Sequence, residues 1–127
     1  MRAYTVATAA VTLRVPPKWI DNVLSQNNVD GVVRLRQGIA RRLTPKAVVA
    51  LDIALRLSNT FGTPITTALR LAKQLMAQGS GESAIDAGPG LRLSIDLGRI
   101  EAGVMERLAH AVEIAPSPRR GRPRRRI

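Results

Sequence analysis

The residues with the clearest chemistry are six arginines among the last nine positions of this 127-residue chain. They surround one glycine and one proline, and the segment reads Arg119, Arg120, Gly121, Arg122, Pro123, Arg124, Arg125, Arg126 and Ile127. A packed core cannot absorb guanidinium groups at this density, so the segment is expected to bind a polyanion. The glycine allows the backbone to approach a surface closely, and the proline keeps the strand extended.

The Arg120-Gly121-Arg122-Pro123 segment resembles an AT-hook, the short peptide that binds the minor groove of A·T-rich DNA. The resemblance implies that the arginines enter the narrow, strongly negative groove, where the 2-amino group of guanine would block their path. AT-hooks usually have a proline directly before the Arg-Gly-Arg core, whereas this chain has Arg119 there. The alternative is a solvated basic tail that binds phosphates without sequence preference.

Net positive charge is concentrated at the two ends of the chain. Residues 1–46 carry a net charge of +6, residues 47–115 a net charge of −1 and residues 116–127 a further +6, within a formal total of +11. A general compositional bias toward arginine would spread this excess along the chain. Its confinement to two segments predicts that both of them meet DNA.

Composition limits the size of the core and the kinds of binding and catalytic site that the chain can form. With 45% apolar residues the chain can form one modest core, and residues 116–127 are too polar to join it, so they are expected to be disordered. One Tyr, one Trp and one Phe are too few to stack successive bases of single-stranded nucleic acid. The absence of cysteine excludes disulfides, thiolate metal sites and cysteine nucleophiles.

Neither a leader peptide nor a membrane segment is predicted. The apolar start from Ala3 to Leu13 is interrupted by Arg14 and followed by Pro16 and Pro17, which is unlike a signal peptide. No uncharged apolar stretch approaches the length that spans a bilayer. The protein is therefore expected to be cytoplasmic and nucleoid-associated, with no membrane partner.

The first part of the chain predicts a short strand at residues 4–6 followed by two helices. The first helix covers residues 7–14. The second begins after Pro16-Pro17, because a proline in the first helical turn leaves no hydrogen bond unmade, and it ends at Asn27-Asn28. Helical spacing divides this second helix into a buried face of Ile20, Val23 and Leu24 and an outer face of Lys18, Asp21, Asn22 and Ser25.

A hairpin and two more helices are predicted next. Residues 32–35 and 39–43 are apolar, β-branched runs around Arg36-Gln37-Gly38, which is typical of a β-hairpin. Helices are expected at 47–59 and 64–77, and these should pack on each other and support the hairpin. Each is introduced by a threonine that caps the helix and a proline at the first helical position, as Thr44-Pro45 and Thr63-Pro64.

From residue 4 to residue 77 the order of elements resembles the DNA-binding domain of MerR-type regulators and the related excisionase-like winged helices. The residues that carry the resemblance are Arg41 or Arg42 with the helix cap Thr44, and Phe61-Gly62 with Ile65. Leu43 replaces an aromatic residue of the family, and the second helix lacks the family's threonine-leucine-arginine sequence. The resemblance implies a mostly α fold with a small β-hairpin wing, a winged helix-turn-helix. Metal-sensing cysteines have no counterpart, so no metal or other cofactor is implied.

The resemblance also implies that the second helix enters the major groove of double-stranded DNA. Asn22 would then pair with adenine and Lys18 with guanine or a phosphate, although both are also ordinary residues of a solvated helix face. Trp19 is expected to pack against neighbouring elements rather than on a base. The arginines of the hairpin are expected to contact phosphates or the minor groove: Arg34, Arg36, Arg41 and Arg42.

The second part of the chain predicts an association element. Residues 78–90 are rich in Gly and Ser and are expected to form a linker. Residues 91–97 alternate as a half-buried strand, and residues 99–115 carry an apolar helical stripe. Because the 91–115 element has no obvious partner in the chain, pairing with a second copy is predicted, the alternative being the strand at residues 4–6. The expected dimer or partner interface consists of Leu93, Ile95, Leu97, Ile100, Val104 and Leu108.

Catalysis is not predicted, and two classes of function remain. His110, the only histidine, lies among apolar neighbours without a carboxylate pair, a metal motif or a nucleophile elbow. One class is a sequence-specific regulator in which a dimer places two winged domains on DNA half-sites and the tails add minor-groove contacts. The other is an interaction protein, such as an antitoxin or adaptor, whose residues 91–115 bind a protein partner. An architectural DNA protein lies between the two.

Overall fold

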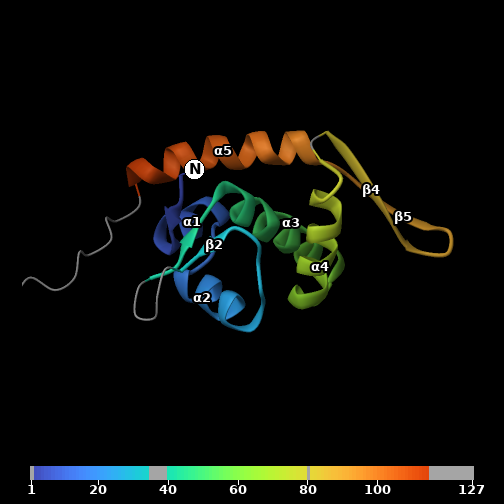
Figure 1. The fold of residues 1–127 in the computed structure, drawn as a ribbon, viewed down its shortest axis with the longest axis horizontal. Helices are drawn as coiled ribbons and strands as arrows, with labels where there is room; N and C mark the ends of the chain where they lie inside the picture. The colour runs from blue at the N-terminus through green and yellow to red at the C-terminus, as the bar shows by residue number, and fades with distance from the viewer. Residues whose placement is uncertain (1, 35–39, 80, 115–127) are drawn as a thin grey trace, which may run out of the picture.

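The structure, a computed structural model, describes residues 2–34, 40–79 and 81–114 (Figure 1). Within these residues it contains five helices, a three-stranded antiparallel sheet and a separate two-stranded antiparallel sheet. The prediction of a mostly α fold with small β elements is confirmed at this level. Arg36 and the predicted disordered tail of residues 116–127 lie outside the described residues.

A short strand and two short helices open the chain, as the sequence predicts. β1 covers Tyr4–Thr5 and α1 covers Val6–Leu13. Oγ1 of Thr5 accepts a hydrogen bond from the backbone N–H of Thr8 at 3.1 Å, which satisfies one of the free donors at the start of α1. Arg14 ends α1 in the left-handed conformation, with φ 58°, and so redirects the chain toward the next helix.

The next helix, α2, covers Pro17–Gln26. Pro17 stands at its first position, and Asn27 ends it by donating its backbone N–H and its side-chain amide to the carbonyl of Val23. The predicted apolar face is confirmed, because Ile20, Val23 and Leu24 are all buried. Trp19 is half-buried and packs against the core, as expected.

The three-stranded sheet is built around the predicted hairpin. Its strands are β2 at Val32–Val33 and β3 at Arg42–Leu43, with β1 added on the free side of β3. The strands are shorter than predicted. Tyr4 pairs with Leu43, and both are buried against the helices, whereas Arg42 is exposed on the opposite face. The sheet therefore holds Arg42 on its solvent face.

Two contacting helices form the centre of the core. α3 covers Pro45–Phe61, is capped at its start by Thr44 and ends at Gly62, with φ 70°. α4 covers Ile65–Met76 and packs along α3. The prediction that Thr63 caps α4 is wrong, because Pro64 occupies the cap position and no side chain hydrogen-bonds there. The backbone N–H of Ala68 instead begins the helix by donating to the carbonyl of Pro64 at 2.9 Å.

The predicted linker at residues 78–90 is wrong for most of its length. β4, Glu82–Gly88, pairs antiparallel with β5, Leu91–Asp96, and the two form a hairpin that extends away from the helices (Figure 1). Pro89 and Gly90, with φ 77° at the glycine, occupy the turn in the order typical of a type II turn. The strand at 91–96 therefore pairs with its sequence neighbour, and neither a second copy nor β1 is needed to complete it.

The base of this hairpin is tied to the end of α4. The buried hydroxyl of Ser83 donates to the carbonyl of Leu75, and the backbone N–H of Ala84 donates to the side-chain oxygen of Gln78 at 3.1 Å. At the other strand end, the backbone N–H of Leu97 donates to the carbonyl of Gly81 at 2.7 Å. These bonds satisfy backbone groups that the short sheet leaves open.

The last helix, α5, covers Leu97–Ile114 and lies across α1 and α3, on the side of the molecule opposite α2 (Figure 1). Its inner stripe belongs to the common core, since Leu97, Val104 and Leu108 are at most 2% exposed. Residues 97–114 are therefore part of the same packed unit as the first half of the chain. The prediction of a separate element with no partner in its own chain is wrong, because α1 and α3 together present an apolar surface that α5 covers.

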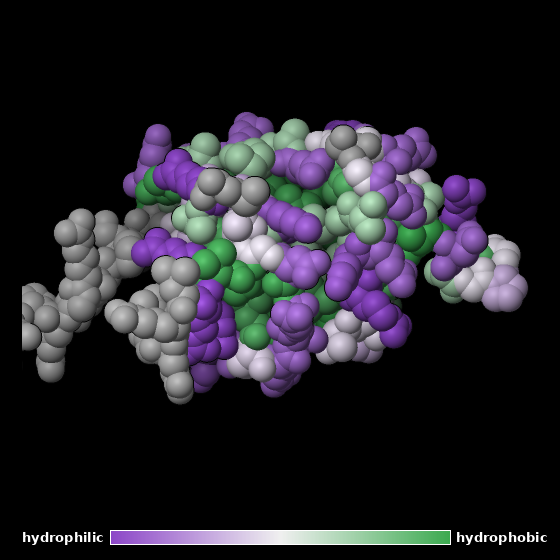
Figure 2. Space-filling view, in the orientation of Figure 1, coloured by the Kyte–Doolittle hydropathy of each residue, from purple (hydrophilic) through white to green (hydrophobic). Residues whose placement is uncertain are grey.

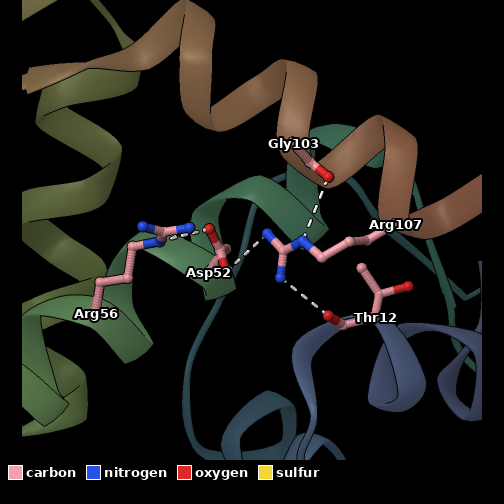
Figure 3. Close-up of polar contacts among 5 residues, drawn as sticks. All are labelled: Thr12, Asp52, Arg56, Gly103 and Arg107. Atoms are coloured by element: carbon pink, nitrogen blue, oxygen red, sulfur yellow. Dashed lines mark hydrogen bonds and ion pairs between the residues drawn. The ribbon is translucent and has the colours of Figure 1, made fainter.

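A polar cluster joins α5 to the two helices beneath it (Figure 3). The carboxylate of Asp52 on α3 is almost completely buried and accepts a hydrogen bond from Nε of Arg56 at 2.9 Å. Arg107 of α5 places a guanidinium nitrogen 3.4 Å from the same carboxylate and donates to the carbonyl of Thr12 at 3.1 Å. One arginine thus connects three helices.

Candidate nucleic-acid interface

The outer face of α2 is polar and free of packing contacts with the core. Lys18, Asp21, Asn22 and Ser25 are all exposed, and their spacing of three and four residues places them along one side of the helix. The hydroxyl of Ser25 donates to the carbonyl of Asn22 at 2.9 Å and so remains close to the backbone. The side chains of Lys18 and Asn22 are the long polar groups that project from this face.

The three-stranded sheet carries two of the predicted hairpin arginines on its solvent side. Arg34 follows β2 directly and is exposed, and Arg42 on β3 is exposed on the face away from the core. Because Leu43 anchors β3 in the core with no exposed surface, Arg42 is fixed on the opposite side of the strand. The predicted contact residue Arg36 lies between the two strands, outside the described residues.

One ion pair brings α2 and the hairpin together. A guanidinium nitrogen of Arg41 lies 3.8 Å from a carboxylate oxygen of Asp21, and the side chain of Arg41 retains only 22% of its exposure. Arg41 is therefore less available to a phosphate than Arg34 or Arg42. The contact links the residue before β3 to the outer face of α2, an arrangement that sequence patterns did not reveal.

The surface between α2, α3 and α4 contains basic residues that sequence reasoning did not select. Lys46, Arg70 and Lys73 surround a cavity there, and within the part of the chain that the structure describes only Lys73 has a carboxylate at ion-pair distance, with Nζ 3.9 Å from Asp30. The sequence shows Arg70 and Lys73 three residues apart on α4. They line a cavity because the α2–β2 loop lies against α4, and sequence spacing does not show that contact.

The residues predicted to form a dimer or partner interface are largely used within the chain. Leu97, Val104 and Leu108 are buried, and Leu93, Ile95 and Ile100 are half-buried and packed against the core. A different set of α5 side chains is exposed, at the helical spacing of a second stripe: Ala102, Met105, Ala109 and Val112. Met105 and Val112 are 45% and 39% exposed, so this stripe leaves apolar surface on the outer side of α5.

The β4–β5 hairpin and His110 of α5 are two further exposed features of the described residues. In Figure 2 the hairpin stands clear of the body and mixes hydrophilic with apolar residues. Leu91 at its tip is 61% exposed. His110 is exposed on α5, on a side of the helix away from the buried stripe.

Comparisons with known proteins add no relative to these observations. No family model, no curated protein and no solved structure matches the chain. Among the helices of the described ranges, none combines the length and the apolar character needed to cross a membrane.

Proposed function

We propose that this chain is a sequence-specific binding protein for double-stranded DNA, and that it acts as a transcriptional regulator. The observation that carries the proposal is the placement of an exposed polar helix face beside a β-hairpin with two exposed arginines, joined by the Asp21–Arg41 ion pair. A helix of this kind fits the major groove, and an adjacent hairpin can follow the phosphate backbone. In this proposal β2 and β3 are the wing of a winged helix-turn-helix in which α1 and α2 are the two helices.

In this proposal Asn22 and Lys18 of α2 bind different groups of the DNA. Asn22 presents an amide that can both donate to and accept from the major-groove edge of adenine, and Lys18 can reach guanine or a phosphate. Arg34 and Arg42 contact phosphates and fix the register of the protein on the duplex. Arg41 stays with Asp21 and holds the wing at a fixed distance from α2.

The basic tail would add binding energy without depending on the position of α2. Its AT-hook-like segment, Arg120-Gly121-Arg122-Pro123, would enter the minor groove of A·T-rich DNA next to the site that α2 reads. Because the tail is tethered to the same chain, its contacts would raise affinity through effective concentration. DNA binding of this kind would place the protein in the cytoplasm, at the nucleoid.

Self-association is the second part of the proposal. The exposed stripe of Ala102, Met105, Ala109 and Val112 has the three-four spacing of helix pairs. In an antiparallel pair of α5 helices, Arg99 near one end would lie beside Glu113 near the other end of the second copy, and the reverse. A dimer of this kind would present two α2 helices to two half-sites.

The same stripe favours one alternative function. An exposed apolar helix face could bind another protein, so that the chain serves as an antitoxin or adaptor whose DNA binding is autoregulatory. Sizing the purified chain alone, and after co-expression with the products of neighbouring genes, separates these possibilities. A stable dimer alone supports the regulator, whereas a monomer that enters a defined heteromeric complex supports the alternative.

Selection of preferred sites from random duplexes tests the proposed DNA reading. Intact protein should enrich one motif, and Asn22→Ala should relax one base position of that motif by about 1–3 kcal/mol. Arg42→Ala should weaken binding to all duplexes by similar factors, because a phosphate contact carries no base information. Arg92→Ala, which removes an exposed arginine of the distant β4–β5 hairpin, is the control and should change neither result. Enrichment of no motif by the intact protein would contradict the proposal.

A further inference from the structure

A cavity of about 320 Å³ lies between the loop that follows α2 and the helices α3 and α4. Its inner surface is apolar: Val29 of the loop, Ala50 of α3 and Leu69 of α4 line it and are each 8–9% exposed. Met76 and Ala77 continue this apolar surface at the end of α4. The volume lies at the lower end of the range that holds small organic ligands, roughly 300–1,000 Å³.

The rim of the cavity is cationic. Lys46 from the first turn of α3 and Arg70 and Lys73 from α4 line it, and all three are exposed. Among the described residues of the lining, Asp30 is the one acidic side chain, and its carboxylate lies 3.9 Å from Nζ of Lys73. Three cations and one carboxylate leave an excess of two positive charges around an apolar floor.

We infer that this cavity binds a small anion with an apolar body, such as a medium-chain or aromatic carboxylate or an organic phosphate ester. The apolar floor would hold the hydrocarbon part, because its removal from water is favourable. Lys46 and Arg70 would bind the anionic head, since neither has an acidic partner within ion-pair distance among the described residues. The exposed hydroxyl of Thr66 offers a further hydrogen bond at the same rim.

The carboxylate of Asp30 is a competitor for the same cations. It already occupies the position that an anionic ligand would take near Lys73, so it lowers the affinity of the cavity for other anions. This contact predicts an unusual result, namely that removal of a charged residue from the site strengthens binding. The inference goes beyond DNA binding and does not depend on it.

The experiment uses the full chain and three probes at matched concentrations: octanoate, its neutral counterpart octanamide, and acetate. Amide chemical shifts in a ¹⁵N-labelled sample locate the site and give the affinity. Octanoate should bind with a Kd of about 1 mM or tighter. Its largest shifts should fall at residues 27–30, 66–77 and around Lys46. Octanamide lacks the charge and acetate lacks the apolar body, so each should bind at least about fivefold more weakly.

Four variants test the inference within the site. Arg70→Gln should weaken octanoate binding about threefold to fivefold, whereas Arg92→Gln on the β4–β5 hairpin should have no effect. Asp30→Asn should tighten it by about twofold to fivefold. Ala77→Phe should abolish binding, because it fills the cavity from an exposed position, while the thermal unfolding midpoint stays within a few degrees of the parent.

Four outcomes would overturn the inference. One is the absence of saturable octanoate binding to the intact chain, and another is equal binding of octanoate and octanamide, which would mean that the cations do not contribute. The third is shifts that persist unchanged in Ala77→Phe, which would place the ligand elsewhere. Inorganic phosphate is a fourth probe: if it binds as tightly as octanoate, the rim binds anions without using the apolar floor, and the assignment of an amphipathic ligand is wrong.

Discussion

Asp52 of α3 and Arg107 of α5 form an ion pair in which the carboxylate is almost completely buried and the guanidinium is partly exposed, with 3.4 Å between oxygen and nitrogen. The same arginine donates to the carbonyls of Thr12 and Gly103, so its position is fixed from three sides (Figure 3). Among the described residues, this is the ion pair that joins α5 to the first half of the chain. It fixes the register of α5 on α1 and α3.

Replacing Asp52 with Asn should lower the free energy of unfolding by about 1–3 kcal/mol, because the partly buried guanidinium of Arg107 would lose its charged partner. Arg56→Gln is the matched control. Arg56 is the other partner of Asp52, and its own side chain is 59% exposed, so the substitution should lower the free energy of unfolding by less than about 1 kcal/mol. Urea unfolding at neutral pH measures both values. Equal losses in the two variants would show that the interhelical contact contributes little.

The glycine at position 31 joins the α2–β2 loop to the sheet. Its carbonyl accepts a hydrogen bond from the backbone N–H of Thr44 at 2.9 Å, and its φ is 92°. A Cβ at this position would overlap Oγ1 of Thr44, the cap of α3. Gly31→Ala should therefore destabilise the chain by about 1–3 kcal/mol, because both the backbone conformation and the cap would change.

Replacing Gly103 with alanine should have the opposite effect on stability to Gly31→Ala. Gly103 lies within α5, and a Cβ there would meet no atom within 4 Å. Gly103→Ala should raise the free energy of unfolding by about 0.5–1 kcal/mol, since alanine loses less conformational entropy in a helix. The changes in unfolding free energy caused by Gly31→Ala and Gly103→Ala, measured by thermal and urea unfolding, should have opposite signs. Destabilisation by Gly103→Ala would indicate that α5 is strained or packed differently at this turn.

Local chain chemistry accounts for the parts of the fold that could be predicted. The proline at the start of α2, the Thr44 cap and the Gly62 end are each decided within a few residues, and the buried face of α2 follows from helical spacing alone. The β4 strand was missed because its small residues resemble a linker. Pro89-Gly90 before the alternating β5 strand was the pattern that could have revealed the hairpin.

Contacts between distant elements could not be predicted in the same way. Periodicity shows that α5 has an apolar side, but not that α1 and α3 complete the core beneath it. For the same reason the exposed position of Asn22 was predictable, whereas the ion pair of Asp21 with Arg41 was not. The cavity residues Lys46 and Arg70 are 24 positions apart and meet only through the packing of α3 on α4.

The outer stripe of α5 predicts where a dimer would be disrupted. Met105→Glu places a charge in the middle of the exposed stripe and should convert a dimer to a monomer at micromolar concentration, without a large change in the unfolding of the monomer. His110→Glu introduces the same side chain on the same helix, at an exposed position outside the stripe, and should leave the dimer intact. Light scattering measures both.

Ile95 distinguishes this dimer from one formed through the hairpin. It is half-buried, pairs with Ser83 within the chain and packs against the core, so Ile95→Asp should lower thermal stability rather than change the oligomeric state. A stable Ile95→Asp monomer formed from a parent dimer would place the interface on the hairpin instead. A parent chain that is monomeric throughout the measured range would remove the half-site arrangement from the proposed function.

The arginine-rich tail predicts a measurable change in the salt dependence of DNA binding. Each phosphate that the protein neutralises contributes about −0.9 to the slope of log affinity against log salt concentration. Deleting residues 117–127 removes six arginines and should therefore reduce the magnitude of that slope, by as much as about 5 if every arginine contacts a phosphate.

Gly121→Val separates the two interpretations of the tail, because it keeps all six charges while obstructing close approach to the groove floor. If the tail binds as an AT-hook, this variant should lose affinity for A·T-rich duplexes and keep it for G·C-rich duplexes. Equal affinities of the variant and the parent on both duplexes, together with a reduced slope after deletion, would identify the tail as a phosphate-binding segment without groove preference.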